Sequence, residues 1–236
     1  MDTQQFDALI IGFGKAGKTL AVTLANAGKK VALVERTPKM YGGTCINIAC
    51  IPTKVLVSAA EHHQSFDEAM THKTTVVTRL NEKNYHMLAD RETVSVIEGE
   101  ASFVDDHTVK VVVGDDELVV SAPQIFINTG AESIIPDIPG VDKPFVYTST
   151  ELLDKMTQPK HLAIIGGGYI GLEFASTYTK LGTKVTVFER GDALLVREDP
   201  AIARATTEAL QAQGIEIVFS VDVTAIEGES TATIRT

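Results

Sequence analysis

One succession of elements occurs twice in this chain, and this repeat constrains the fold more than any other feature. In the first copy, residues 6–11 (FDALII) predict a buried strand, residues 12–17 (GFGKAG) a glycine-rich turn and residues 18–27 a helix. A second predicted strand, residues 31–34, leads into Glu35, which lies 23 positions after Gly12. This order is typical of a dinucleotide-binding fold built on a parallel sheet.

The second copy begins 154 positions later. Residues 162–165 (LAII) predict a strand, residues 166–171 (GGGYIG) the turn and residues 169–180 a helix. The next strand, residues 184–188, leads into Glu189, again 23 positions after the first glycine of the turn. Two complete copies predict two dinucleotide sites and an α/β fold with two Rossmann-like domains.

Each residue type in the repeat has a physical role. The first two glycines let the backbone turn and approach a pyrophosphate, the third lets helix and strand pack closely, and the helix N-terminus faces the negative charge. The acid accepts hydrogen bonds from a ribose. The predicted residues of the first site are Gly12, Gly14, Gly17, Glu35 and Arg36, and those of the second are Gly166, Gly168, Gly171 and Glu189.

A rival motif overlaps the first turn. Residues 12–19 (GFGKAGKT) also fit the phosphate loop of ATPases and GTPases, in which Lys18 and Thr19 would hold phosphate and magnesium. Such an enzyme has no use for a second glycine turn, and it needs an aspartate at a strand end, where this chain has Glu35. The dinucleotide interpretation therefore predicts that Lys18 is a solvated helix residue.

The only two cysteines, Cys45 and Cys50, lie five positions apart within residues 42–54 (GGTCINIACIPTK). A disulfide that closes so short a loop would stabilise the chain by about 2 kcal/mol at most, so a purely structural disulfide is a weak explanation of the pair. No further set of soft ligands follows at metal-site spacing, so no metal site is predicted. Two alternatives remain, a pair of buried free cysteines and a redox-active pair. The glycines before the cysteines and Pro52 after them favour a redox-active pair at a loop-to-helix junction. At such a junction the helix N-terminus lowers the pKa of a thiol.

Residues 42–54 resemble the active-site signature of the flavoprotein disulfide reductases, the pyridine nucleotide-disulfide oxidoreductase family that contains lipoamide dehydrogenase, glutathione reductase and mercuric reductase. The resemblance extends over the whole chain, which corresponds to the first half of a family member. Residues 12–21 (GFGKAGKTLA) and 42–48 (GGTCINI) look most like a bacterial branch near mercuric reductase associated with defence against reactive chlorine species and hypothiocyanous acid. Ala49 stands where family members usually have glycine, and Thr53 where lipoamide dehydrogenases usually have serine.

The resemblance implies roles for individual residues. Cys50 is then the flavin-side sulfur and Cys45 the exposed interchange thiol, joined as a disulfide in the oxidised protein. Lys54 matches the lysine beside the flavin, and Glu173 matches the glutamate that pairs with it. The first site is implied to hold FAD, with further contacts from Gly42, Gly43, Thr44, Thr129 and Gly130.

The second site is implied to hold a nicotinamide cofactor. A carboxylate at Glu189 favours a free ribose 2′-hydroxyl and repels a 2′-phosphate, so NADH is expected rather than NADPH. Arg190, the next residue, works against that preference.

The remaining sequence predicts how the chain is divided. Residues 55–89 predict one long helix or two shorter ones, and residues 94–97, 101–104, 108–113 and 117–120 an antiparallel meander. The stiff segment 135–140 (IPDIPG) marks a boundary between an FAD-binding domain, 1–148, and an incomplete NAD(P)H-binding domain, 149–236. By resemblance, a C-terminal dimerisation domain is absent and the full-length form is a homodimer.

Composition excludes several classes of partner. The formal net charge of −10 and the lack of any basic run argue against nucleic acid and anionic membranes. The longest apolar stretch, residues 162–172, is too short to span a bilayer, and no signal peptide is visible, so a cytoplasmic location is expected. The leading hypothesis is an enzyme that reduces a small-molecule oxidant, metal ion or disulfide; the alternatives are a non-catalytic nucleotide-binding fragment and the phosphate-loop ATPase.

Overall fold

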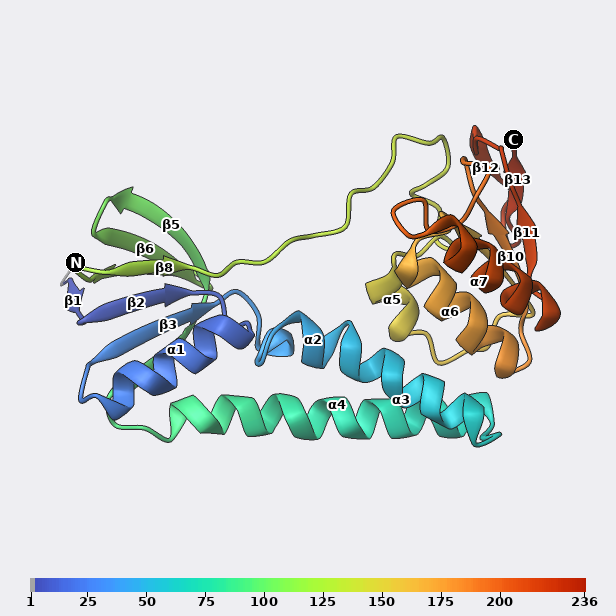
Figure 1. Cartoon of the computed structure of the whole chain (residues 1–236). Coiled ribbons are helices and arrows are strands. Elements are labelled where there is room, and N and C mark those ends of the chain that lie inside the picture. The colour runs from blue at the N-terminus through green and yellow to red at the C-terminus, as the bar shows by residue number, and fades with distance from the viewer. Residues whose placement is uncertain (1–2) are drawn as a thin grey trace. The chain divides into compact units, whose positions relative to one another are not determined.

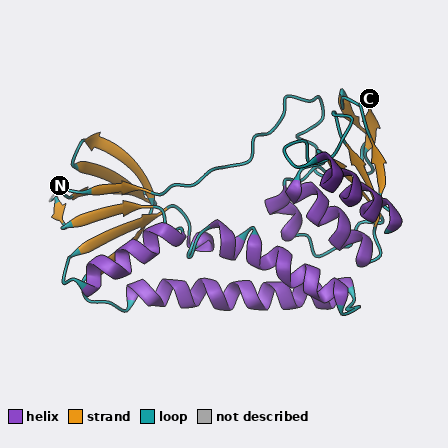
Figure 2. Ribbon diagram, in the orientation of Figure 1, coloured by secondary structure: helices purple, strands orange, loops and turns teal. Residues whose placement is uncertain are grey.

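The computed structural model of the chain describes residues 3–236, which form two compact units. The first unit comprises Met1–Pro52 and Thr74–Glu132, and the second comprises Thr53–Lys73 and Ser133–Thr236. Each unit contains a parallel sheet with helices (Figures 1 and 2), so the predicted α/β class is confirmed. Among the described residues, no helix has the length and apolar character needed to cross a bilayer.

The parallel sheet of the first unit follows the first sequence repeat. Strand β2 (Ala8–Ile11) pairs with β3 (Val31–Glu35) on one side and with β8 (Ile125–Ile127) on the other. Helix α1 (Lys15–Asn26) connects β2 to β3 and lies beside them (Figure 1). The glycine turn follows β2 directly, so it lies at the carboxyl edge of the sheet, where ligands of such sheets bind.

The fourth strand of this sheet is β4 (Val94–Glu98), which pairs in parallel with β3. Residues 94–97 were expected in the antiparallel meander, and that part of the prediction is wrong. β4 forms hydrogen bonds with the edge of β3 that β2 leaves open, and it therefore extends the parallel sheet. The length and composition of a strand do not reveal which partner it pairs with. The meander itself consists of β5 (Glu100–Asp105), β6 (Thr108–Val113) and β7 (Asp116–Ser121), and the short β1 (Gln4–Gln5) extends it in parallel to β7.

Alternate side chains of the parallel sheet enter two separate cores, as the period of a strand requires. Ile10 and Leu33 belong to the cluster that contains Ala21 of α1 and Leu88 of α4. Leu9 belongs to the opposite cluster, which contains Val109 of the meander. The sheet is therefore covered by helices on one face and by the meander on the other.

Helices follow the first two strands of the sheet. Residues 55–89 form two helices, α3 (Cys50–Glu61) and α4 (Phe66–Ala89), rather than one. Ser65 starts α4 with a capping box, because the Ser65 hydroxyl accepts from the Glu68 N–H and the Glu68 carboxylate accepts from the Ser65 N–H. A 3-10 turn, η1 (Pro38–Met40), and the single-turn helix α2 (Thr44–Asn47) lead into α3.

The second unit follows the second repeat. Its parallel sheet has the order β11 (Glu216–Val218), β10 (Lys184–Phe188), β9 (His161–Ile165), and α6 (Tyr169–Lys180) connects β9 to β10. The core contains apolar side chains of α6 and of residues 53–73, among them Leu56, Met70 and the fully buried Tyr178. The elements are α5 (Ser149–Leu153), β9 (His161–Ile165), α6 (Tyr169–Lys180), β10 (Lys184–Phe188), α7 (Pro200–Ala212), β11 (Glu216–Val218), β12 (Ala225–Glu227) and β13 (Thr233–Arg235).

Candidate functional sites: two glycine turns and a thiol pair

The two glycine turns have nearly the same backbone. Gly12 has φ +106° and Gly166 has φ +105°, a region that L side chains rarely adopt. A Cβ atom on Gly17 would lie 2.4 Å from the carbonyl oxygen of Gly12, and one on Gly171 would lie 2.4 Å from that of Gly166. The third glycine of each turn is therefore required for close packing of helix and strand, as the sequence predicts.

The acid of each repeat holds its own turn. Glu35 accepts a hydrogen bond from the Phe13 N–H at 2.9 Å, and Glu189 accepts one from the Gly167 N–H at 2.7 Å. The second carboxylate oxygen accepts from the residue two positions on, the Thr37 N–H at 3.3 Å and the Gly191 N–H at 2.7 Å, respectively. Since a carboxylate has about four acceptor positions, each acid keeps capacity for the hydroxyls of a ribose.

Sequence reasoning missed Asn128, which comes directly after β8. Its Nδ2 atom donates to the Gly12 carbonyl at 3.1 Å. A Cβ atom on Gly14 would lie 2.8 Å from this Nδ2, and one on Gly17 would lie 2.7 Å from it. The amide thus fits against all three glycines of the first turn. A polar residue at the end of the strand next to β2 was the available signal, because carboxyl ends of parallel strands share one edge.

The cysteine segment packs on the first turn. Gly42 and Gly43 have φ of +93° and +82°, and a Cβ on Gly43 would lie 2.6 Å from the Cα of Gly14. This close approach places α2, which contains Thr44 and Cys45, beside the start of α1. Cys50 begins α3, and in the structure both cysteines are thiols with a hydrogen bond between their side chains. The sequence-predicted pair is therefore brought together.

Two expectations about the thiols are wrong. The hydrogen bond to Cys50, and then burial, raise the pKa of Cys45, although Lys15 and Lys18 act to lower it. A lowered pKa was expected from the helix terminus, but α2 is a single turn with little dipole, and the neighbouring thiol dominates. Cys45 is half-buried, although it was expected to be exposed, because the glycine pair holds α2 against Gly14.

Lys54 and Glu173 form an ion pair within the second unit. Nζ of Lys54, on α3, lies 2.5 Å from Oε2 of Glu173, on α6. Partial burial raises the pKa of Glu173, but hydrogen bonds from Lys54 and Thr53 outweigh it and hold this pKa below its ordinary value. A cavity of about 400 Å³ beside the pair is lined by residues of α3, α6 and α7, including Tyr169 and Lys180.

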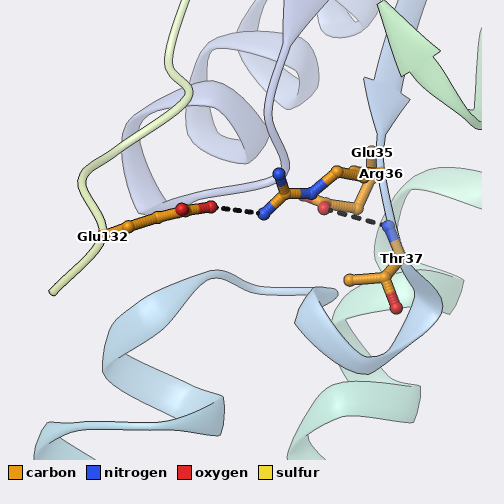
Figure 3. A network of polar contacts seen from close by, with 4 residues as sticks. All are labelled: Glu35, Arg36, Thr37 and Glu132. Carbon is orange, nitrogen blue, oxygen red and sulfur yellow. Dashed lines mark hydrogen bonds and ion pairs between the residues drawn. The ribbon is translucent and has the colours of Figure 1, made fainter. Parts of the chain in front are cut away.

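Arg36, another predicted contact, directly follows β3 and lies beside Glu132 (Figure 3). Arg36 donates to Glu132 at 2.7 Å, and both side chains are exposed to solvent. Thr129 and Gly130 precede Glu132 on the same segment, and Gly130 has φ +75° with open space around it. Within residues 3–236, no three or more His, Cys, Asp or Glu side chains gather as a metal site.

Lys18 differs from its expected role as a solvated residue. It is half-buried, and its ammonium donates to Oδ1 of Asn84, a buried residue of α4. Burial lowers the pKa of Lys18. The prediction was wrong because α4, 66 residues away in the chain, covers this face of α1.

Comparison with known proteins places these features in a family. Residues 6–236 match the family model described as pyridine nucleotide-disulphide oxidoreductase. The chain is 50% identical over 220 residues to the probable pyridine nucleotide-disulfide oxidoreductase RclA of Escherichia coli K12, a match that covers 93% of this chain and 50% of that protein. It is 36% identical over 235 residues to mercuric reductase of Lysinibacillus sphaericus, covering 92% of this chain and 42% of the relative.

A solved structure agrees with the sequence comparison. The Cu(II) complex of the HOCl-induced flavoprotein disulfide reductase RclA from Escherichia coli aligns with a TM-score of 0.96 and 47% identity, over 100% of this chain and 54% of that one. The chain thus spans about half the length of the relatives it matches. The match favours dinucleotide sites over a phosphate loop and confirms the predicted resemblance: the chain belongs to the pyridine nucleotide-disulphide oxidoreductase family, whose members are flavoenzymes.

Proposed function

We propose that the full-length protein is an FAD-dependent disulfide reductase that takes electrons from NADH and passes them through the Cys45–Cys50 disulfide to an acceptor. The observation that carries this proposal is the hydrogen-bonded thiol pair held on the first glycine turn by the contact of Gly43 with Gly14. We assign residues 1–148 to FAD binding and residues 149–236 to nicotinamide binding. By family, the full-length form is a homodimer.

The chain's own residues fit the two cofactors. In the first turn, Gly12, Gly14 and Gly17 give backbone approach to a pyrophosphate, and Glu35 presents its carboxylate to a ribose. Arg36, Gly42, Gly43, Thr44, Thr129 and Gly130 complete the proposed FAD site. In the second turn, a Cβ on Gly166 or Gly168 would meet no atom within 4 Å, which leaves room for a phosphate.

Glu189 supports NADH over NADPH. Backbone N–H groups donate to both of its carboxylate oxygens and hold the negative charge at the end of the strand. This charge would repel the 2′-phosphate of NADPH. Arg190 is exposed beside it. We expect Glu189→Gln to narrow the preference for NADH over NADPH, as measured by the ratio of the two dissociation constants.

Four side chains are assigned to the chemistry. FAD, when bound, would supply the two-electron relay between the nicotinamide and the disulfide. Cys50 is the proposed flavin-side sulfur and Cys45 the thiolate that exchanges with the acceptor, an assignment that rests on the family resemblance. The ammonium of Lys54, held by Glu173, would offset negative charge beside the flavin.

The acceptor class is an oxidant, a metal ion or a small disulfide. Among the relatives, mercuric reductases are named for a metal ion, glutathione reductase for a disulfide, and RclA is described as HOCl-induced. A second candidate function is nucleotide binding without turnover. Activity with FAD, NADH and an acceptor in a longer form, but not in this chain, would select that candidate.

The test is the visible spectrum of the chain reconstituted with FAD, followed anaerobically as NADH is added. We expect the flavin to bleach and a long-wavelength charge-transfer band to develop, and we expect that band to be missing in Cys50→Ser. A bound flavin that NADH does not reduce would contradict the nicotinamide assignment. A band that persists in Cys50→Ser would contradict the assignment of the flavin-side sulfur.

A further inference from the structure

Helix α2 is a single turn, and one side chain at its end joins that end to the residues before its start. Asn47, the last residue of α2, donates from Nδ2 to the Gly43 carbonyl at 2.9 Å and to the Tyr41 carbonyl at 3.0 Å. A helix this short is not stable by itself, so such contacts decide where it lies. Cys45 lies between the residues that Asn47 joins, and whatever holds Asn47 therefore also holds the backbone of Cys45.

Asn81, a residue of α4, holds Asn47 in turn. Its Nδ2 donates to Oδ1 of Asn47 at 3.0 Å, across 34 positions of the chain. The same Nδ2 also donates to the carbonyl oxygens of Pro38 and Lys39 in η1, at 3.1 Å each. Its two N–H groups are thus shared among three acceptors. One amide therefore connects α4 both to the turn before α2 and to the last side chain of α2.

The same face of α4 supports the cysteine segment at two further points. Asn84 and Tyr85 follow Asn81 by three and four positions, so the three side chains lie on one face of the helix. A Cβ on Gly42 would lie 3.0 Å from Cγ of the buried Asn84. The ring of Tyr85 stacks on that of Tyr41, with the ring centroids 4.8 Å apart. This face of α4 therefore supports the segment before α2, and Asn81 connects it to α2 itself.

We propose that Asn81, acting through Asn47, is a positioning residue that stabilises the disulfide form of the cysteine pair. A disulfide holds its two Cβ atoms about 3.5–4.5 Å apart, so the oxidised pair tolerates only a narrow range of positions of α2. In the dithiol the two side chains already lie in hydrogen-bond contact, so the present position of α2 suits the closed bond.

The direction of the effect follows from the freedom of the two forms. Without the amide contact, the dithiol gains freedom of its backbone, whereas the disulfide stays constrained by its own covalent bond. Loss of the contact therefore favours the dithiol, because the two sulfur atoms are less well placed to meet. The inference rests on the proposed function, in which this pair is the redox couple.

The test is the equilibrium of the pair with dithiothreitol, which needs neither FAD nor NADH. Dithiothreitol gives two electrons and two protons to the pair, so the S–S bond of the protein breaks and the cyclic disulfide of the reagent forms. The full chain is equilibrated without oxygen at pH 7 over a series of ratios of reduced to oxidised reagent. It is then quenched with acid and alkylated, and mass spectrometry reads the fraction of dithiol. We expect Asn81→Ala to shift the equilibrium constant toward the dithiol by about two- to tenfold, the range for one hydrogen bond.

Three variants separate this role from other effects of the substitution. Asn81→Asp keeps the size of the side chain but sets a carboxylate against three oxygens, so it should shift the equilibrium at least as far as Asn81→Ala. In an Asn47→Ala background, Asn81→Ala should have less than half of its effect, because its route to α2 is gone. The matched control is Asn26→Ala, which removes an acceptor of Arg91 in the same unit and should leave the equilibrium unchanged.

The equilibrium constant distinguishes positioning from a general structural role, because a loss of stability that is equal in both redox forms does not move it. Circular dichroism checks that each variant is folded, and Asn81→Ser replaces Asn81→Ala if the latter unfolds. A native equilibrium constant in a folded Asn81→Ala, Asn81→Ser or Asn81→Asp variant would overturn this inference and leave the proposed function standing. So would an equal shift in Asn26→Ala, or an undiminished effect of Asn81→Ala in the Asn47→Ala background. A native chain in which Cys45 and Cys50 form no disulfide would overturn the proposed function and this inference with it.

Discussion

At the scale of single residues, two titratable side chains in the core of the second unit respond to burial in opposite directions. Burial raises the pKa of Tyr178 to about 12. Burial lowers the pKa of Lys73, whose ammonium donates to the Leu153 carbonyl at 2.6 Å, and the attraction of Asp154 only partly offsets this. Both groups resist the charged form for the same physical reason, the loss of hydration.

Tyr178 gives a prediction for alkaline pH. Its ordinary pKa is about 10, so the unfolded chain loses this proton first, and the stability that the neutral phenol contributes is complete below pH 10 and is lost as pH rises toward 12. In urea unfolding at pH 8 and pH 11, we expect the native chain to lose about 1 kcal/mol more stability than Tyr178→Phe. Equal losses in the two proteins would contradict this.

The Lys54–Glu173 pair gives a prediction for acid pH. Hydrogen bonds from Lys54 and Thr53 hold the pKa of Glu173 below its ordinary value, so the stability that they add is present above that value and is lost as pH falls through the lowered pKa. Lys54→Met should raise the pKa of Glu173, followed by carbon-13 NMR of its carboxylate. Lys180→Met, which removes the partner of Glu61 in the same unit, is the matched control and should leave the titration of Glu173 in place.

At the scale of elements, the support of each glycine turn depends on the strand beside it in the sheet. The first turn rests on Asn128 at the end of β8, and its three glycines surround the Asn128 amide. In the second sheet, order β11-β10-β9, no further strand of the described residues pairs with β9 on its other side.

Asn128 gives a test of that support. Asn128→Ala removes the hydrogen bond to Gly12, and one such bond contributes about 0.5–1.5 kcal/mol, so FAD should bind roughly two- to tenfold more weakly. Asn128→Leu should weaken FAD binding further, because its branched end meets Gly14 and Gly17. Flavin fluorescence measures the affinity. The control is Asn26→Ala at the other end of α1, and loss of FAD binding there would argue against a local effect.

The success of sequence-based prediction at this scale depends on the range of the interactions. The two strand-turn-helix repeats were predictable because a buried strand, its glycines and its acid lie within one short segment. The placement of β4, the burial of Lys18 and the contact of Asn128 with the turn all depend on partners far away in the chain. The exposure of Cys45 and Cys50 likewise depends on how two glycines pack α2 against Gly14.

At the scale of the whole molecule, the chain has two glycine turns, one in each compact unit. The acids Glu35 and Glu189 hold these turns with the same pair of backbone contacts, and each pair lies entirely within its own unit. Loss of one turn should therefore leave the other intact.

Gly168 allows this independence to be tested without damage to the fold. It has open space where a Cβ would lie and an extended backbone that any residue adopts, whereas a Cβ on Gly171 would lie 2.4 Å from the Gly166 carbonyl. Gly168→Ala should keep the thermal midpoint and FAD affinity of the native chain but weaken NADH binding at least about tenfold, since the methyl group occupies the space assigned to the pyrophosphate. Gly171→Ala should lose both stability and NADH binding but keep FAD binding, and Gly17→Ala, whose Cβ meets the Gly12 carbonyl at the same 2.4 Å, should lose stability and FAD binding but keep NADH binding. If Gly168→Ala weakened FAD binding as much as NADH binding, the two turns would be coupled, and the assignment of one nucleotide to each turn would have to be given up.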